Sequence, residues 1–305
     1  MLLLNMFRGF CMALADSVPG VSGGTIAFLL GFYDKFIGSL NHLISGTKEQ
    51  RKEALIFLLK MGIGWVIGFL GAMLILSEIF ESHIYVVSAL FFGLTLFAIP
   101  VVIHEERECM KGKLKFIPFL IAGAVLVVGI SMLSKMLGGG SIVFEGFNIG
   151  IMLFTFVAGM VAISAMVLPG ISGSTILLAF GVYLPTTSAI SSILKFESFS
   201  GIPYLCALAL GIVTGIILII KAVDRALKNY RAQSMYAIIG LMIGSLYAIC
   251  QGPTTLDEPV PALGLSTVAE DPILIVPFLA GGVILAVLEF LRYLMEKKEK
   301  QAAAK

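Results

Sequence analysis

Two copies of one short motif hold most of the side chains in this sequence that could do chemistry. The first copy is PGVSGGT at residues 19–25, and the second is PGISGST at residues 169–175. Proline and glycine interrupt helices, while serine and threonine add hydroxyl groups. A helix that begins at such a motif directs free backbone N–H groups and the positive end of its dipole toward it. Both motifs therefore predict binding of an anion, and a phosphate suits the predicted pocket.

The candidate phosphate ligands come from both motifs and from one arginine before the first. Ser22 is a favourable helix N-cap, and the neighbouring glycines permit unusual backbone angles. Arg8 is a cation within an apolar segment, where a charge is costly and suggests function. Asp16 is a candidate for capping the opposing helix or for proton or cation coupling. The residues predicted to bind the phosphate are Arg8, Ser22, Gly23, Gly24, Thr25, Ser172, Gly173, Ser174 and Thr175.

Other readings of the motif differ in how well they fit the sequence. Close packing of helices through small residues is the structural alternative, and the motif alone leaves it open. A nucleotide-binding loop is excluded because no Gly-Lys-Ser/Thr follows the motif. The three histidines, His42, His83 and His104, fall at the ends of apolar segments and fit neither a catalytic constellation nor a metal site. We therefore expect no catalytic residue, no metal and no cofactor.

The composition places these motifs in a membrane protein. The chain has 305 residues, of which 58% are hydrophobic and 13% charged, and its mean hydropathy is +1.01. Apolar runs of about 20 residues can cross a bilayer as helices. The fold class predicted is an all-α integral membrane protein. The apolar runs are residues 54–76, 84–103, 116–134, 148–168, 202–220, 234–250 and 273–295.

The chain is also duplicated. Between residues 15–34 and the positions 150 residues later, nine identities recur, including the Pro-Gly-x-Ser-Gly-x-Thr pattern. Each half then reads as a segment broken by the motif, followed by three long helices. We predict a first repeat at residues 1–140, with a hairpin at 1–45. The second repeat covers 141–305, with a hairpin at 148–194.

The distribution of lysine and arginine predicts the orientation of both halves. The loops at residues 46–53, 104–115 and 221–234 are rich in these residues, whereas 77–83 and 251–272 have none. Basic loops face the cytoplasm, so both termini are expected there. The first hairpin then enters and leaves from the cytoplasm, and the second from outside. This is the inverted-topology repeat of many secondary transporters, with a substrate site at broken helices near the midplane.

Each motif could instead join two complete membrane-spanning helices. The second broken segment is long enough for this arrangement. Only 18 residues precede Pro19, with Arg8 near their middle, so a re-entrant hairpin fits the first segment better. The repeat favours the same shape for the second.

The two motif regions also resemble a known family. The stretches ADSVPGVSGGTIAFLLGFYDKFI (residues 15–37) and LPGISGSTILLAFGVY (168–183) are similar to PopT-type bacterial membrane proteins, linked to undecaprenyl-phosphate translocation. The resemblance implies a flippase in the bacterial inner membrane that returns this lipid carrier to the cytoplasmic leaflet for envelope polymer synthesis. It implies a polyprenyl phosphate as partner and no nucleic acid, and it leaves a homo-oligomer open. The alternatives are a small-anion transporter and a membrane enzyme acting on a lipid phosphate.

Overall fold

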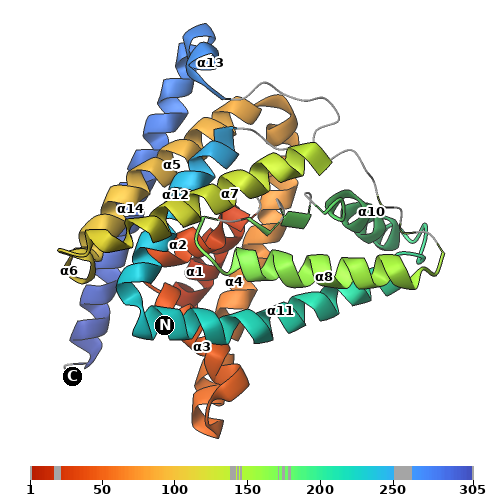
Figure 1. Ribbon diagram of the computed structural model, residues 1–305, viewed down its shortest axis with the longest axis horizontal. Coiled ribbons are helices and arrows are strands. Elements are labelled where there is room, and N and C mark those ends of the chain that lie inside the picture. Colours follow the sequence, from red (N-terminus) through yellow and green to blue (C-terminus); the bar gives the residue numbers. More distant parts are fainter. Residues whose placement is uncertain are drawn as a thin grey trace.

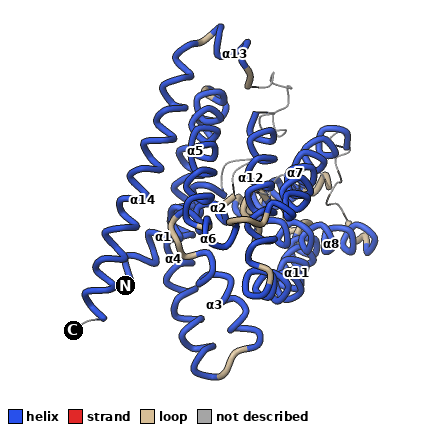
Figure 2. The backbone as a smooth tube through the Cα atoms, turned by 60° about the vertical axis from the view of Figure 1, so that its left-hand side comes forward, coloured by secondary structure: helices blue, strands red, loops and turns tan. Residues whose placement is uncertain are grey.

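The computed structural model describes residues 2–16, 22–137, 142, 144, 146–170, 172–173, 176–177, 180–250 and 263–303. Within these residues the chain forms helices and no β-strand (Figure 2). The all-α fold class is therefore confirmed. Five residues of the first motif region, 17–21, and Ile171, Ser174 and Thr175 of the second lie outside the described residues.

Seven helices, counted within the described residues, are long and apolar enough to cross a membrane, as the apolar runs predict. The apolar runs at residues 54–76 and 202–220 belong to helices that are longer than the runs themselves. Their extensions carry Lys, Glu, Gln and Arg, which are good helix formers and continue a helix beyond the bilayer. The seven are α4 (Lys48–Ser82), α5 (Ile84–Glu105), α7 (Ile117–Leu137), α8 (Ile149–Met166), α11 (Ile202–Asn229), α12 (Arg231–Cys250) and α14 (Ile275–Ala303).

Shorter elements complete the chain. The N-terminal region forms α1 (Leu2–Asp16), α2 (Gly23–Leu29) and α3 (Tyr33–Ser45), and α10 (Tyr183–Leu194) follows the second motif. The connections contain α6 (Arg107–Met110), η1 (Leu114–Phe116), α13 (Leu265–Glu270) and η2 (Pro272–Leu274).

The same chain reversal precedes α3 and α10. Gly31 has φ 67° and Gly181 has φ 66°, in the left-handed region that glycine adopts without strain. One residue later, the N–H of Phe32 donates to the carbonyl of Ala27 at 3.0 Å, and the N–H of Val182 donates to that of Leu177 at 2.9 Å. Such hydrogen bonds close a helix C-terminus in a Schellman-type turn. The turn ends α2 at Leu29, and α3 begins after it at Tyr33.

Long helices pair through glycines at matching positions of the two halves. α1 packs along α4 and α8 packs along α11. Gly64 of α4 lies against the backbone of Met6, and Gly211 of α11 lies against the backbone of Phe156. A β-carbon at either glycine would collide with a main-chain carbonyl. Small residues give close helix approach in lipid, where apolar surface alone does not drive helices together.

Each of the remaining long helices pairs with a helix from the other half of the chain. α5 packs with α14, and α12 packs with α7. Gly93 of α5 meets the backbone of Phe278, and Gly240 of α12 meets the backbone of Leu120. In both pairs, one helix comes from the first half of the chain and the other from the second half. The two halves are therefore packed into each other and do not form separate layers (Figure 1).

The ends of the helices separate into two groups. In Figure 1, both chain ends, α6, the α3–α4 turn and the α11–α12 turn lie toward the lower left. The α4–α5 turn and α13 lie at the top, and the start of α8 lies at the right. The segments α1 and α8 approach the centre of the molecule from these two different directions.

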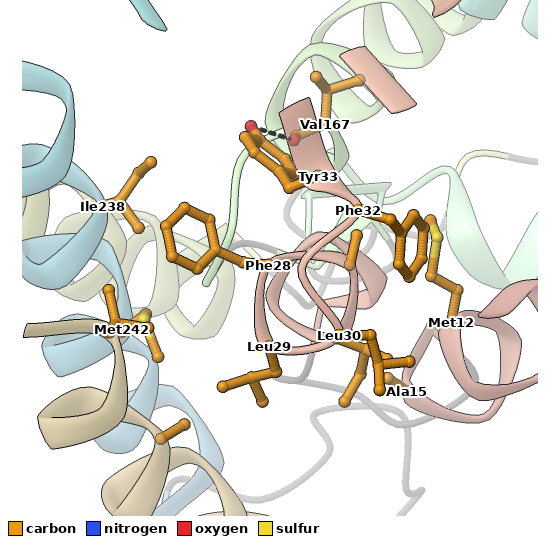
Figure 3. Packing of buried hydrophobic residues seen from close by; sticks show 14 of the residues in the cluster. Met12, Ala15, Phe28, Leu29, Leu30, Phe32, Tyr33, Val167, Ile238 and Met242 are labelled. Atoms are coloured by element: carbon orange, nitrogen blue, oxygen red, sulfur yellow. Dashed lines mark hydrogen bonds between the residues drawn. The ribbon is translucent and has the colours of Figure 1, made fainter. Parts of the chain in front are cut away.

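The core surrounds α2. All seven residues of α2 are buried, and the turn after it adds Leu30 and Phe32, which are 0% and 1% exposed. Figure 3 shows Phe28 facing Ile238 and Met242, while Phe32 lies beside Met12. A helix of two turns is not stable alone, so this packing holds α2 at the centre of the protein.

Candidate functional site

The first motif forms a capped helix start. Ser22 has φ −120° and ψ 131°, and its hydroxyl accepts a hydrogen bond from the N–H of Gly24 at 3.1 Å. The predicted N-cap is thus confirmed. Because the cap uses a lone pair of the Ser22 oxygen, its hydroxyl hydrogen remains available for another partner.

That partner belongs to the second motif region. The Ser22 hydroxyl donates to the carbonyl of Leu168 at 3.2 Å. The N–H of Gly170 donates to the hydroxyl of Thr25 at 3.0 Å, and the Tyr33 hydroxyl donates to the carbonyl of Val167 at 3.0 Å (Figure 3). We call these three interactions, between Ser22, Thr25 and Tyr33 on one side and Val167, Leu168 and Gly170 on the other, the motif contact.

The motif contact satisfies the backbone where α8 has ended. Residues 167–170 are turn and bend rather than helix, so the carbonyls of Val167 and Leu168 and the N–H of Gly170 lack regular helical partners. Non-helical backbone at membrane depth is tolerated only where protein or a wet cavity surrounds it. Gly170 has φ 89°, and a β-carbon there would come within 2.7 Å of the Leu241 backbone. Both the conformation and the space at this position therefore require glycine.

Glycine also allows a close approach in the first motif, at Gly24. A β-carbon on Gly24 would lie 3.3 Å from the backbone of Leu168 and Pro169. Ser22 and Thr25 are 1% and 5% exposed. The two motif regions therefore meet directly, with hydroxyl groups of the first bonded to backbone groups of the second.

Asp16 occupies the start of α2. Its carboxylate accepts hydrogen bonds from the N–H of Gly23 at 2.7 Å and from the indole N–H of Trp65 at 3.0 Å. A negative charge is favourable at this position because free N–H groups and the helix dipole point toward it. Asp16 thus caps the helix of its own segment rather than that of the opposing one. The chain's own carboxylate fills the position where the sequence predicts an anion.

Arg8 lies apart from these interactions, within the interior of the N-terminal helices. It is 8% exposed, donates to the side chain of Asn5 at 3.3 Å, and places its guanidinium 5.3 Å from the centre of the Phe32 ring. In the second motif, Ser172 is 5% exposed. A β-carbon at Gly173 would lie 3.3 Å from the side chain of Met166. The two other candidates there, Ser174 and Thr175, lie outside the described residues.

An ion cluster, which the sequence reasoning missed, ties three distant segments together. Arg231 pairs with Asp34 at 2.6 Å and donates through Nε to Glu106 at 3.1 Å, with a second contact to the same carboxylate. The neighbour of Asp34, Lys35, does not join this cluster, and its ammonium group lies 5.0 Å from the centre of the Phe57 ring. Burial and the Glu106 carboxylate raise the pKa of the Cys109 thiol, which makes it a weak nucleophile at neutral pH.

Two of the residues that the sequence reasoning missed carry weak signals. Trp65 is the single tryptophan of the chain, and a buried indole N–H requires an acceptor. Tyr33 recurs as Tyr183 in the repeat, but repetition alone does not identify a bonding partner. Among the described residues, no group of three His, Cys, Asp or Glu side chains is arranged to hold a metal ion.

The helices and their buried polar contact define the class: this is a multi-pass α-helical membrane protein with broken helices meeting at its centre. The chain belongs to the undecaprenyl phosphate translocase-like family, which residues 12–267 match. This confirms the resemblance seen in the two motif regions.

Two relatives cover most of the chain. A polyprenyl-phosphate transporter from Staphylococcus aureus is 35% identical over 260 residues, which is 83% of this chain and 88% of the relative. A polyprenyl-phosphate transporter from Vibrio cholerae is 31% identical over 272 residues, covering 86% of this chain and 82% of the relative. Both come from bacteria, which supports a bacterial membrane location. No solved structure matches the chain.

Proposed function

We propose that this protein is a polyprenyl phosphate flippase that returns the lipid carrier from the outer to the cytoplasmic leaflet. Its membership of the translocase-like family and the names of its two relatives support transport of a polyprenyl phosphate. The observation that carries the proposal within the structure is the motif contact. It joins two interrupted helices in the protein interior, where a transporter places its substrate site.

The proposed architecture is an inverted repeat of residues 1–140 and 141–305. The recurring Gly31 and Gly181 turns support the duplication, as do the equivalent pairs α1–α4 and α8–α11. The proposed first hairpin consists of α1, α2 and α3, and the second begins with α8 and ends with α10. Approach of α1 and α8 to the centre from different directions supports opposite insertion (Figure 1).

The proposed orientation places both termini in the cytoplasm. The segments rich in lysine and arginine are near α6, the α3–α4 turn and the α11–α12 turn, which lie on one side of the molecule (Figure 1). Loops enriched in these residues remain on the cytoplasmic side during insertion. The side that includes α13 then faces outward.

The proposed phosphate site opens when the motif contact separates. The hydroxyls of Ser22 and Thr25 would then exchange their partners in the second motif for phosphate oxygens. Arg8 would supply a positive charge from the cytoplasmic side. Glycines and hydroxyls of both motifs would complete the site; the set is Gly23, Gly24, Ser172, Gly173, Ser174 and Thr175.

Asp16 is proposed to couple phosphate binding to a proton. Its carboxylate already lies against the N–H of Gly23, so an ionised Asp16 repels a phosphate that approaches the same donor. Protonation removes this repulsion. An inward proton gradient should therefore accelerate transport by the native protein, and Asp16→Asn should abolish that acceleration.

The test uses purified protein in liposomes that contain a radiolabelled polyprenyl phosphate in both leaflets. A phosphatase outside the vesicles can attack only the outer leaflet in protein-free liposomes. A flippase should make nearly all of the lipid accessible, and phosphatidic acid should remain protected as the control lipid. Uptake of soluble phosphate without lipid movement would establish the small-anion alternative. Release of phosphate from polyprenyl diphosphate by the protein alone would establish the enzyme.

A further inference from the structure

A cleft between three helices lies beside the motif contact. It has a volume of about 310 Å³ and is bounded by α7, α11 and α12. Its walls are apolar apart from a few hydroxyl groups, and small residues such as Ala122 and Ala226 leave the space open. This volume is at the lower end of the range for ligand pockets, about 300–1,000 Å³.

The inner end of the cleft is formed by the motif contact itself. Tyr33 from the first half and Leu168 from the second both line it. These are two of the residues whose side chain or backbone joins the halves. A ligand in the cleft is therefore adjacent to the proposed phosphate site rather than to an unrelated surface.

The outer side of the cleft faces the membrane. Phe119 and Leu126 of α7 line the cleft and are 46% and 49% exposed. Both belong to the candidate membrane span of residues 114–132. An opening at this position allows a lipid chain to enter sideways from the bilayer without crossing water.

One end of the cleft carries polar groups. Ser234, in the first turn of α12, lines this end. Lys115 lies four residues before Phe119, in the 3₁₀ turn η1 that packs on α12. The Lys115 ammonium group is 5.2 Å from the centre of the Phe116 ring, and that ring meets Tyr236 of α12 edge-on at 6.4 Å. The Ser234 hydroxyl therefore lies at the end that the proposed orientation places in the cytoplasm, and Lys115 lies on the adjacent turn η1, outside the lining of the cleft.

We propose that this cleft binds the isoprenoid units next to the phosphate of polyprenyl phosphate, with Lys115 and Ser234 holding the phosphate as it reaches the cytoplasmic leaflet. The inference rests on the proposed function and adds to it a tail-binding site and a release position. An apolar wall with a hydroxyl group at one end and a lysine on the adjacent turn complements a lipid with a single anionic head group. The limited volume holds only the first units, and the remaining chain stays in the bilayer.

The test maps contacts with a photoreactive lipid. A polyprenyl monophosphate with a diazirine on its first isoprene unit is mixed with the full-length protein in nanodiscs, illuminated, and located by mass spectrometry. We expect crosslinks to α7 and α11 at the cleft. Ala122→Phe, which fills the cleft from α7, should reduce them to about a fifth, the effect of losing roughly 1 kcal/mol of binding free energy.

Matched variants separate the cleft from a general effect on α7. Val125, which is 64% exposed and does not line the cleft, provides the control Val125→Phe on the same helix. This variant should crosslink as the native protein does. Lys115→Gln should weaken binding of the monophosphate by up to about fivefold, as expected for an exposed ion pair. It should leave binding of the uncharged polyprenol unchanged.

Each outcome bears on one proposal. Crosslinks only at helices that do not line the cleft, or equal loss in Ala122→Phe and Val125→Phe, would overturn the cleft proposal even if the liposomes show lipid movement. Equal competition by phosphatidic acid would also overturn it, because the cleft would then accept any anionic lipid. Specific crosslinks at the cleft without lipid movement would support this site while removing the proposed flippase activity.

Discussion

Replacing Thr25 by valine tests the motif contact with almost no change of shape. The Thr25 hydroxyl accepts the N–H of Gly170 at 3.0 Å, and the residue is 5% exposed. Valine fills the same volume but accepts no hydrogen bond. In Thr25→Val the N–H of Gly170 would therefore remain buried without this acceptor.

The expected loss follows from two general magnitudes. Leaving a buried donor unsatisfied costs about 1–3 kcal/mol in water-soluble proteins. Hydrogen bonds between membrane helices are worth about 0.6 kcal/mol on average and about 1.7 at most. Gly170 lies in a turn with no regular helical partner, so we expect a loss of about 1–1.7 kcal/mol, near the upper value for membranes.

The assay is thermal unfolding of the purified protein in a single detergent. At about 2–4 °C per kcal/mol, Thr25→Val should lower the Tm by roughly 2–7 °C. Thr25→Ser keeps the hydroxyl and loses only a methyl group, so its Tm should lie clearly above that of the valine variant. Equal Tm values for the valine variant and the native protein would refute the role assigned to this hydrogen bond. So would a serine variant as unstable as the valine variant.

Three further substitutions test other parts of the same centre. Gly170→Ala should strongly reduce the yield of folded protein in size-exclusion chromatography, since a β-carbon there meets backbone at 2.7 Å, whereas Gly129→Ala, with open space around it, should behave as native. Trp65→Phe removes one of the two donors to Asp16 and should destabilise the protein by about 1–3 kcal/mol, seen as a lower Tm in the same unfolding assay. Arg231→Lys keeps the charge but loses the planar fork between two carboxylates; it should destabilise the protein by up to about 1–2 kcal/mol in that assay, and a native Tm would contradict the ion cluster.

The membrane helices were predictable because their signal is local. A run of about 20 apolar residues identifies a spanning helix without reference to any other part of the chain. The seven predicted segments correspond to seven described helices, although α4 begins at Lys48 rather than at residue 54. Helix ends are less predictable, because charged helix formers extend a helix into water as readily as they end it.

The partners of the motif residues were not predictable. The sequence identified Ser22 as an N-cap and Thr25 as a hydroxyl donor, but it did not show that they meet Leu168 and Gly170. These pairs are 146 and 145 residues apart. α5 and α8 are apolar almost all round, so no polar stripe in their sequences marks the face that turns inward.

Asp16 shows the same division between local and distant information. A carboxylate beside a helix start indicates a cap, and the sequence suggested one. Only the packing of α1 on α4 brings Trp65 to its other oxygen, 49 residues away. That Asp16 caps α2 of its own segment, rather than the opposing helix, is likewise shown only by its hydrogen bond from the N–H of Gly23.

The amino-acid sequence by itself determined an all-helical membrane protein, the duplicated motif, and the asymmetry of basic loops. Each of these follows from composition, length or repetition along the chain. The tertiary structure decided that the two motifs bond to each other, that Asp16 fills the start of α2, and that the halves exchange α7 and α14. These features depend on close packing through Gly64, Gly93, Gly211 and Gly240, where the absence of a side chain lets distant backbones touch. Such contacts depend on three-dimensional fit, which periodicity and composition do not encode.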